Sequence, residues 1–81
     1  MKITVRLFAR ARDLAGLEWI DLDVPESACV ADLKRSLAAR YPQVAPLVSS
    51  LLVAVGTDYA DDATVLSEDV EVACFPPVSG G

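Results

Sequence analysis

One segment of the chain carries hydrophobic residues at helical spacing, and strand-like segments lie on both sides of it. Hydrophobic side chains recur every three or four residues at Val30, Leu33, Leu37 and Tyr41. This spacing predicts an amphipathic helix that ends just before Pro42. A single main helix can cover only one face of the sheet that the strand-like segments form, so the pattern favours an α+β fold.

Four strand-like segments surround this helix. Residues 2–8 and 17–24 alternate between hydrophobic and polar positions, which is the period of a half-buried strand. The polar stretch between them closes at Gly16, which suits a helical turn and a reversal of the chain. Residues 51–55 and 70–75 predict two further strands.

The segments near these strands give finer expectations. We expect a turn at residues 56–59 and a short edge strand at residues 64–66. Leu17 and Trp19 fall on the same face as Asp21 and Asp23, so we expect another part of the molecule to cover that edge.

The order strand–strand–helix–strand–strand in 81 residues predicts one domain over residues 1–75 and a tail over residues 76–81. In the ubiquitin-like β-grasp fold, a mixed sheet of four to five strands packs against one main helix, and the first and last strands lie parallel at its centre. Phe8 and Phe75 then share the face away from the helix, at the same end of the sheet. This pair is a candidate partner-binding site; the alternative is that both rings pack under loops.

Charge and composition limit the classes of partner. Seven basic residues stand against twelve acidic ones, a net charge of −5, which argues against nucleic acid or an anionic membrane as a partner. A basic protein surface is the better match, although the charge can equally serve solubility. The apolar runs are too short to cross a membrane, and Met1 leads directly into a strand-like run, so we expect a cytoplasmic protein without a signal peptide.

Few residues are available for an internal active site. The sequence has no histidine, no Gly-rich phosphate loop and only two cysteines, Cys29 and Cys74. Two isolated cysteines make neither a disulfide framework nor a zinc pattern, so we predict no metal site and no stably bound cofactor. We interpret Cys29, at the expected start of the helix, as a partly buried structural residue; a reactive thiol is the alternative.

The C-terminal segment is the candidate reactive group. Pro76 and Pro77 cannot donate hydrogen bonds to a sheet, and they hold the chain extended before Val78 and Ser79. With glycine at about 7% of residues, two terminal glycines arise by chance about 0.5% of the time. Lacking Cβ atoms, Gly80 and Gly81 can enter a narrow tunnel, and the carboxylate of Gly81 can be activated by another protein.

These features resemble the ubiquitin-like sulfur carriers of the MoaD/ThiS family, and within it the small subunits of molybdopterin synthase. The resemblance covers the whole chain and has three anchors: Phe8-Ala9-Arg10-Ala11-Arg12-Asp13-Leu14-Ala15-Gly16, Val30-Ala31-Asp32-Leu33, and Glu71-Val72-Ala73 leading into Pro76-Pro77-Val78-Ser79-Gly80-Gly81. The double proline before Gly-Gly is its most specific part, because carriers of the thiamine pathway usually lack it.

The resemblance implies a cycle of activation and transfer. An ATP-dependent enzyme adenylates Gly81, sulfur is added as a thiocarboxylate, and the tail enters a large synthase subunit. There it donates sulfur to cyclic pyranopterin monophosphate, which forms the dithiolene of molybdopterin. Two carriers usually flank a dimer of large subunits, and positions matching Phe8, Arg12, Tyr59 and Phe75 contact the partners.

The chain departs from the family pattern before its last strand, where Glu68-Asp69-Val70-Glu71 lacks the usual glycine and leaves the geometry of that turn open. Other functions also remain open. The carrier can serve thiamine synthesis, tRNA thiolation or cysteine synthesis, it can be a ubiquitin-like modifier that is joined to lysines, or it can be an interaction domain with an inert tail.

Overall fold

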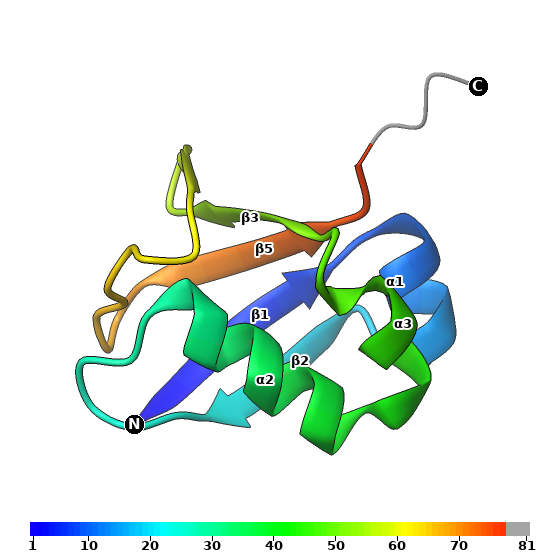
Figure 1. Cartoon of the computed structure of the whole chain (residues 1–81), viewed down its shortest axis with the longest axis horizontal. Helices are drawn as coiled ribbons and strands as arrows, with labels where there is room; N and C mark the ends of the chain where they lie inside the picture. Colours follow the sequence, from blue (N-terminus) through cyan, green and yellow to red (C-terminus); the bar gives the residue numbers. More distant parts are fainter. Residues whose placement is uncertain (78–81) are drawn as a thin grey trace.

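The structure is a computed structural model that describes residues 1–77, so the predictions for Val78, Ser79, Gly80 and Gly81 lie outside the described residues. Its elements follow in the order β1 (Lys2–Leu7), α1 (Ala9–Ala15), β2 (Trp19–Asp23), α2 (Val30–Arg40), η1 (Pro42–Val44), α3 (Ala45–Val48), β3 (Leu52–Val55), β4 (Asp58–Ala60) and β5 (Glu71–Phe75). The 3₁₀ turn η1 and the short helix α3 form the return from α2 to the sheet (Figure 1).

The five strands form one mixed sheet in the order β2-β1-β5-β3-β4. The first strand β1 and the last strand β5 are parallel neighbours at its centre, whereas the other pairs are antiparallel. Figure 1 shows α2 lying across one face of this sheet. The α+β prediction and the ubiquitin-like β-grasp prediction are therefore confirmed.

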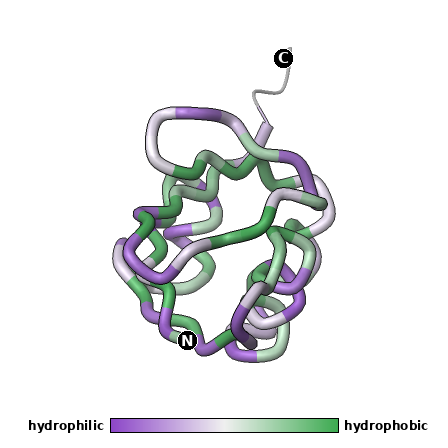
Figure 2. The backbone as a smooth tube through the Cα atoms, turned by 90° about the vertical axis from the view of Figure 1, so that its left-hand side faces the viewer, coloured by the Kyte–Doolittle hydropathy of each residue, from purple (hydrophilic) through white to green (hydrophobic). Residues whose placement is uncertain are grey.

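The core fills the space between the sheet and α2. Alternate residues of the central strands are fully buried, among them Ile3 and Val5 of β1 and Val72 of β5, and they meet Leu33 and Leu37 of α2 in the same cluster. The polar stretches in Figure 2 lie mainly at the turns and along the outside of the molecule. This one-sided burial leaves the other face of the sheet, here called the outer face, without a covering helix.

Two details of the predicted strands were wrong. Asp58 and Tyr59 belong to β4, which pairs with β3 across a hairpin that turns at Gly56 with φ 65°. Residues 64–66 form no edge strand, because their backbone serves the start of α2: the amide of Val30 donates to the carbonyl of Thr64 (3.0 Å), and the amide of Leu66 donates to the carbonyl of Ala28 (2.8 Å).

The edge at β2 also differs from the expectation. Leu17 precedes the strand, and both Leu17 and Trp19 are about half exposed (48% and 47%), so no other described element covers them. The turn between β1 and β2 is a complete helix, α1, which ends at Gly16 in the left-handed conformation (φ 78°) that glycine adopts without strain.

Candidate docking face and tail

The described tail leaves the sheet at the end of β5. This strand ends at Phe75, and neither Pro76 nor Pro77 has an amide hydrogen with which to continue the ladder. Pro76 is half-buried and Pro77 is exposed. The chain therefore leaves the molecule from the carboxyl end of a central strand (Figure 1).

Three of the predicted partner-binding residues meet beside this exit. The rings of Phe8 and Phe75 lie edge to face with centroids 5.8 Å apart, and Tyr59 meets Phe75 in the same way, also at 5.8 Å. Phe8 and Phe75 are half-buried, whereas Tyr59 is 74% exposed. We call Phe8, Tyr59 and Phe75 the aromatic cluster; edge-to-face pairs of this kind hold rings in defined positions.

Strand register explains why distant residues form this cluster. The amide of Phe8 donates to the carbonyl of Cys74 (3.1 Å), which continues the parallel β1–β5 ladder by one residue and places Phe8 beside Phe75. The chain then bends at Ala9, whose φ of 52° is unusual for a residue with a Cβ, and enters α1. Tyr59 reaches Phe75 from β4 over β3, where the small side chain of Ala54 stands opposite Tyr59.

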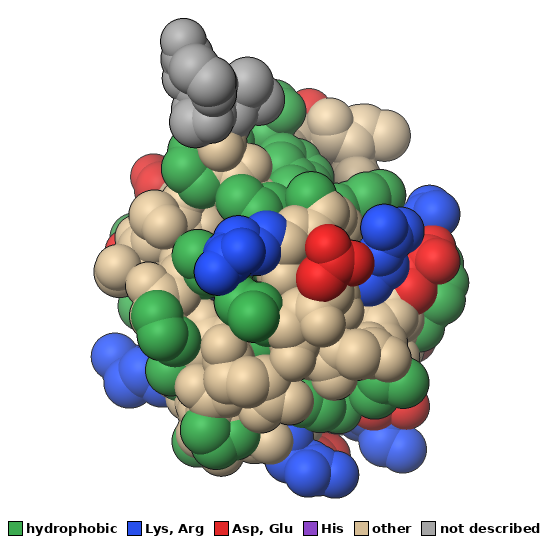
Figure 3. All heavy atoms as spheres, turned by 90° about the vertical axis from the view of Figure 1, so that its right-hand side faces the viewer, with side chains coloured by type: hydrophobic (Ala, Val, Ile, Leu, Met, Phe, Trp, Pro, Cys, Tyr) green, Lys and Arg blue, Asp and Glu red, His purple; other side chains and the backbone are tan. Residues whose placement is uncertain are grey.

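Arg12, the fourth predicted contact residue, lies apart from the rings on α1. It is exposed, and within residues 1–77 its one ion pair is with the neighbouring Asp13, at 3.8 Å between Nε and Oδ1. Figure 3 shows hydrophobic side chains gathered at the end of the molecule where the described chain stops, with basic side chains below them. The side chain of Arg12 is thus available to a partner; among residues 1–77, the link of Arg12 to the aromatic cluster is its backbone amide, which donates to the carbonyl of Phe8 (3.4 Å).

Sequence reasoning missed two residues of the outer face, Arg6 and Trp19. The guanidinium carbon of Arg6 lies 4.8 Å from the centroid of the Phe8 ring and 5.2 Å from that of Trp19. The alternation of residues 2–8 had placed Arg6 and Phe8 on one face, so the i, i+2 spacing was the signal; the contact with Trp19 depends on the β1–β2 register, which pairs Arg6 with Trp19.

The two cysteines have structural roles. Cys74 is fully buried on the inner face of β5, and burial raises the pKa of its thiol to about 12, against a smaller opposite effect of the charge on Lys34. A thiol that stays protonated at neutral pH is a poor nucleophile. Cys74 is therefore a core residue, and its thiol is not a candidate reactive group.

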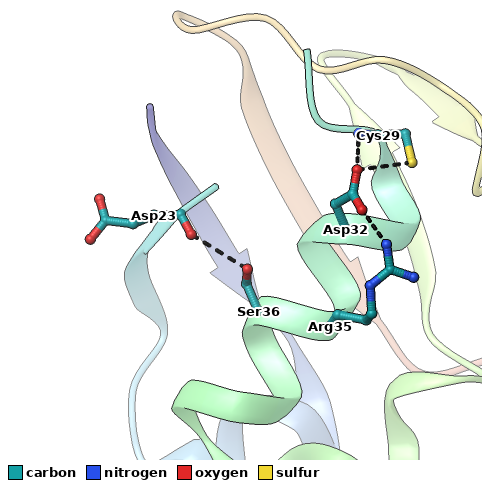
Figure 4. Close-up of polar contacts among 5 residues, drawn as sticks. All are labelled: Asp23, Cys29, Asp32, Arg35 and Ser36. Carbon is teal, nitrogen blue, oxygen red and sulfur yellow. Dashed lines mark hydrogen bonds and ion pairs between the residues drawn. The ribbon is translucent and has the colours of Figure 1, made fainter. Parts of the chain in front are cut away.

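Cys29 begins α2 and is half-buried, as predicted. The Asp32 carboxylate accepts hydrogen bonds from the Cys29 amide (3.0 Å) and from its thiol (3.4 Å), and Arg35 pairs with the other oxygen (Figure 4). These hydrogen bonds, the backbone one first, hold the pKa of Asp32 below that of an ordinary aspartate. Cys29 therefore acts as a helix cap together with Asp32.

A cavity of about 620 Å³ between α2, β3 and the segment after β4 offers no separate reactive centre. Its basic residue, Lys34, pairs with Asp62 at 2.9 Å, and leucine, valine and alanine side chains supply much of the rest of the lining. Within residues 1–77, no three His, Cys, Asp or Glu side chains lie close enough together to hold a metal ion. No described helix is long and apolar enough to cross a membrane.

The turn before β5 does not need the glycine that the family pattern has there. The amide of Val70 donates to the carbonyl of Ser67 (3.3 Å), which closes a turn through Glu68 and Asp69. Neither Glu68 nor Asp69 has a positive φ, so residues with a Cβ fit both positions without strain. Val70 packs against the core, which gives this position a hydrophobic role.

Comparison with known families covers nearly the whole chain. Residues 5–81 match the ThiS family. The chain belongs to the ThiS family. The match includes all of β5, the aromatic cluster and the Gly-Gly segment, so the family assignment extends to the candidate site.

Individual relatives agree with this assignment over most of their lengths. The chain is 31% identical to the molybdopterin synthase sulfur carrier subunit of Arabidopsis thaliana, over 100% of this chain and 84% of that protein. Among solved structures, the putative molybdopterin converting factor subunit 1 from Pyrococcus furiosus has a TM-score of 0.84 at 29% identity, covering 96% of this chain and 99% of that one. The small archaeal modifier protein 1 of Haloferax volcanii has a TM-score of 0.86 at 25% identity, covering 95% and 98%.

Proposed function

We propose that this ThiS-family chain is the sulfur carrier subunit of a molybdopterin synthase and that the carboxylate of Gly81 carries the sulfur. The observation that carries this proposal is the match, along the whole chain, to relatives that are named molybdopterin synthase sulfur carrier subunits. The aromatic cluster beside the exit of the tail supports it, because a carrier must be held by a partner while its terminus reacts.

The proposed chemistry uses the main-chain terminus and no side chain. An ATP-dependent activating enzyme converts the Gly81 carboxylate into an acyl-adenylate and releases pyrophosphate. Sulfur delivered by a donor at the oxidation level of sulfide displaces AMP and leaves a thiocarboxylate. The tail then enters the large synthase subunit and transfers its sulfur to cyclic pyranopterin monophosphate, and water supplies the oxygen that restores the Gly81 carboxylate. Two sulfurs are needed for one dithiolene, which fits an assembly of two small and two large subunits in the cytoplasm.

The tail segment suits passage through a narrow channel. Pro76 and Pro77 restrict the backbone in extended conformations, so less conformational entropy is lost when the segment is ordered by a partner. Gly80 and Gly81 have no Cβ atoms that a tunnel wall would have to accommodate. In this proposal the partner binds the body of the domain at Phe8, Tyr59, Phe75 and Arg12, while residues 76–81 reach the active site of the partner.

The test compares the full chain with a variant that lacks Gly81. Both proteins are incubated with the activating enzyme, ATP and a sulfur donor, and intact mass reveals the exchange of one oxygen for sulfur; the large subunit and the pterin precursor are then added and molybdopterin is measured. We expect the full chain to form thiocarboxylate and molybdopterin and the truncated chain to form neither, with the same unfolding curve. Full molybdopterin formation by the truncated chain would refute the proposal.

A second candidate function follows from the resemblance to the small archaeal modifier protein 1. A modifier would use the same acyl-adenylate, but a lysine amine of a target protein would attack it and form an isopeptide bond. Mass spectra of protein from a competent host separate the two functions: a thiocarboxylate on the free chain supports the carrier, and lysine adducts on other proteins support the modifier. A carrier for another sulfur pathway would form the thiocarboxylate but no molybdopterin.

A further inference from the structure

The outer face carries a half-exposed tryptophan that the core does not need. Trp19 lies on the edge strand β2, directly opposite Arg6 of β1, and 47% of its surface is exposed. The hydrophobic residues that follow Trp19 in the strand differ from it, because Ile20 and Leu22 turn to the inner face and are buried. An indole ring left at the surface in this way is available for contact with another molecule.

Arg6 fixes the position of this tryptophan relative to the aromatic cluster. Its guanidinium lies against both the Trp19 ring, at 5.2 Å, and the Phe8 ring, at 4.8 Å. Oε2 of Glu18 accepts a hydrogen bond from Nε of Arg6 (2.8 Å) and forms an ion pair with Nη2 (2.7 Å). Two rings and one carboxylate therefore hold the guanidinium plane, and the flat group holds the two rings in return.

These contacts join Trp19 to the cluster in one unbroken series. Trp19 contacts Arg6, Arg6 contacts Phe8, Phe8 contacts Phe75, and Phe75 contacts Tyr59. The series runs across the outer face from the edge strand β2 to the edge strand β4. It includes Phe75, the residue from which the tail leaves the sheet.

We propose that the docking face for the large synthase subunit extends to β2, with Trp19 as a contact residue and Arg6 as the positioning residue that orients Trp19 and Phe8. The inference rests on the proposed function, because the occupant is the protein that receives the tail. Continuity favours this occupant: a partner that holds Pro76 and the Phe75 ring meets a surface that continues through Phe8 and Arg6 to Trp19.

Physical reasons favour these residues as binding determinants. Trp, Tyr and Arg are the residue types that most often dominate the binding energy of interfaces. Rings that are held in place before docking lose little conformational entropy on binding. Because Glu18 neutralises Arg6, the series also places no unpaired charge within the apolar contact.

Arginine-to-lysine variants separate the charge from the flat stacking group. Arg6→Lys keeps the positive charge but lacks the planar guanidinium that contacts two rings while it pairs with Glu18. Arg40→Lys is a matched control, because Arg40 stacks on Tyr41 at 5.4 Å at the far end of α2, away from the sheet. Each variant loses a contact between a guanidinium and an aromatic ring, and only the contacts of Arg6 lie on the outer face.

The experiment measures the Kd of the full chain for the large synthase subunit by calorimetry, for wild type, Trp19→Ala, Arg6→Lys, the double variant and Arg40→Lys. We expect Trp19→Ala to weaken binding about 10-fold or more and Arg6→Lys about 5-fold, with Arg40→Lys close to wild type. The double variant should be less impaired than the product of the single effects, because Arg6 acts partly through Trp19. In the free protein, NMR should show shifted Phe8 ring protons in Arg6→Lys and unshifted ones in Arg40→Lys.

Three results would overturn the inference. In the first, wild type binds and yields molybdopterin while Trp19→Ala and Arg6→Lys bind equally well, so the proposed function stands without this extension. In the second, Trp19→Ala abolishes self-association in sedimentation and leaves binding to the large subunit unchanged, which makes a second copy the occupant. In the third, wild type does not bind the large subunit, and the partner assignment fails together with the inference.

Discussion

The ring of Phe8 meets the ring of Phe75 edge to face at a centroid distance of 5.8 Å, although the two residues lie near opposite ends of the chain. The parallel pairing of β1 with β5 brings them together, and the hydrogen bond from the Phe8 amide to the Cys74 carbonyl extends that pairing to Phe8 itself. Phe8, Phe75 and the start of the tail are thereby attached to the two central strands, which are the least mobile part of such a sheet.

Phe75→Ala should weaken binding to the large subunit by about 1–3 kcal/mol, because it removes the ring that contacts both Phe8 and Tyr59. Calorimetric titration measures the effect, and urea unfolding of the same variant shows how much stability is lost. An unchanged Kd would assign Phe75 to packing alone.

One residue added after Gly81 should abolish thiocarboxylate transfer, because it moves the acyl carbon by about 3.5 Å along the channel. Molybdopterin formation is the measurement. The same residue added before Met1 is the control and should leave the activity intact. Activity retained with the longer tail would mean that the terminal carboxylate is not the reacting group.

Leu33→Ala should lower the free energy of unfolding by about 2–5 kcal/mol, because Leu33 is fully buried between α2 and the sheet and its removal leaves a cavity. Leu52→Ala is the matched control: Leu52 is exposed on the outer face, so the same change should cost about 1 kcal/mol or less. Urea denaturation measures both, and equal losses would contradict the assigned core.

Asp32→Asn should lower Tm by roughly 5 °C at neutral pH, because it weakens the cap that the carboxylate forms with Cys29. The pKa of Asp32 is lowered in the folded state, so this stabilisation is present above the pKa of an unfolded aspartate, about 3.9, and is lost as the pH falls through the lower folded value. The Tm difference between wild type and Asp32→Asn should therefore shrink below about pH 4.

The exposed Asp69 of the turn before β5 provides a control for the loss of one carboxylate, and Asp69→Asn should leave the Tm at neutral pH nearly unchanged. A difference between wild type and Asp32→Asn that stays constant down to pH 2, scanned by circular dichroism, would show that the charge of Asp32 does not stabilise the cap.

A thiol reagent at neutral pH should modify Cys29 before Cys74. Cys29 is partly exposed, whereas Cys74 is buried and its pKa of about 12 keeps it protonated. Mass spectrometry of the native protein should show one label, and the denatured protein should show two. Rapid double labelling of the native state would place Cys74 outside the core.

The sequence was sufficient for the elements that depend on local pattern. The spacing of Val30, Leu33 and Leu37 gave α2, and the alternation of residues 2–8 and 70–75 gave the two central strands, because side-chain periodicity follows directly from backbone geometry. The candidate Gly-Gly tail was also visible from sequence, since the chemistry proposed for it belongs to the main chain and needs no folded surroundings.

The tertiary structure decided what depends on contacts between distant segments. Residues 64–66 look like a strand, but their backbone hydrogen-bonds to the start of α2. Residues 56–59 look like a turn, but the hairpin at Gly56 places Asp58 and Tyr59 in the edge strand β4. The contacts of Arg6 with Trp19 and of Tyr59 with Phe75 depend on strand register, which local propensity does not specify. The predicted β-grasp arrangement had already placed Phe8 and Phe75 at the same end of the outer face. The sequence by itself thus determined the helix, the central strands and the candidate reactive terminus, whereas only the fold decided that Tyr59, Arg6 and Trp19 join Phe8 and Phe75 on the outer face.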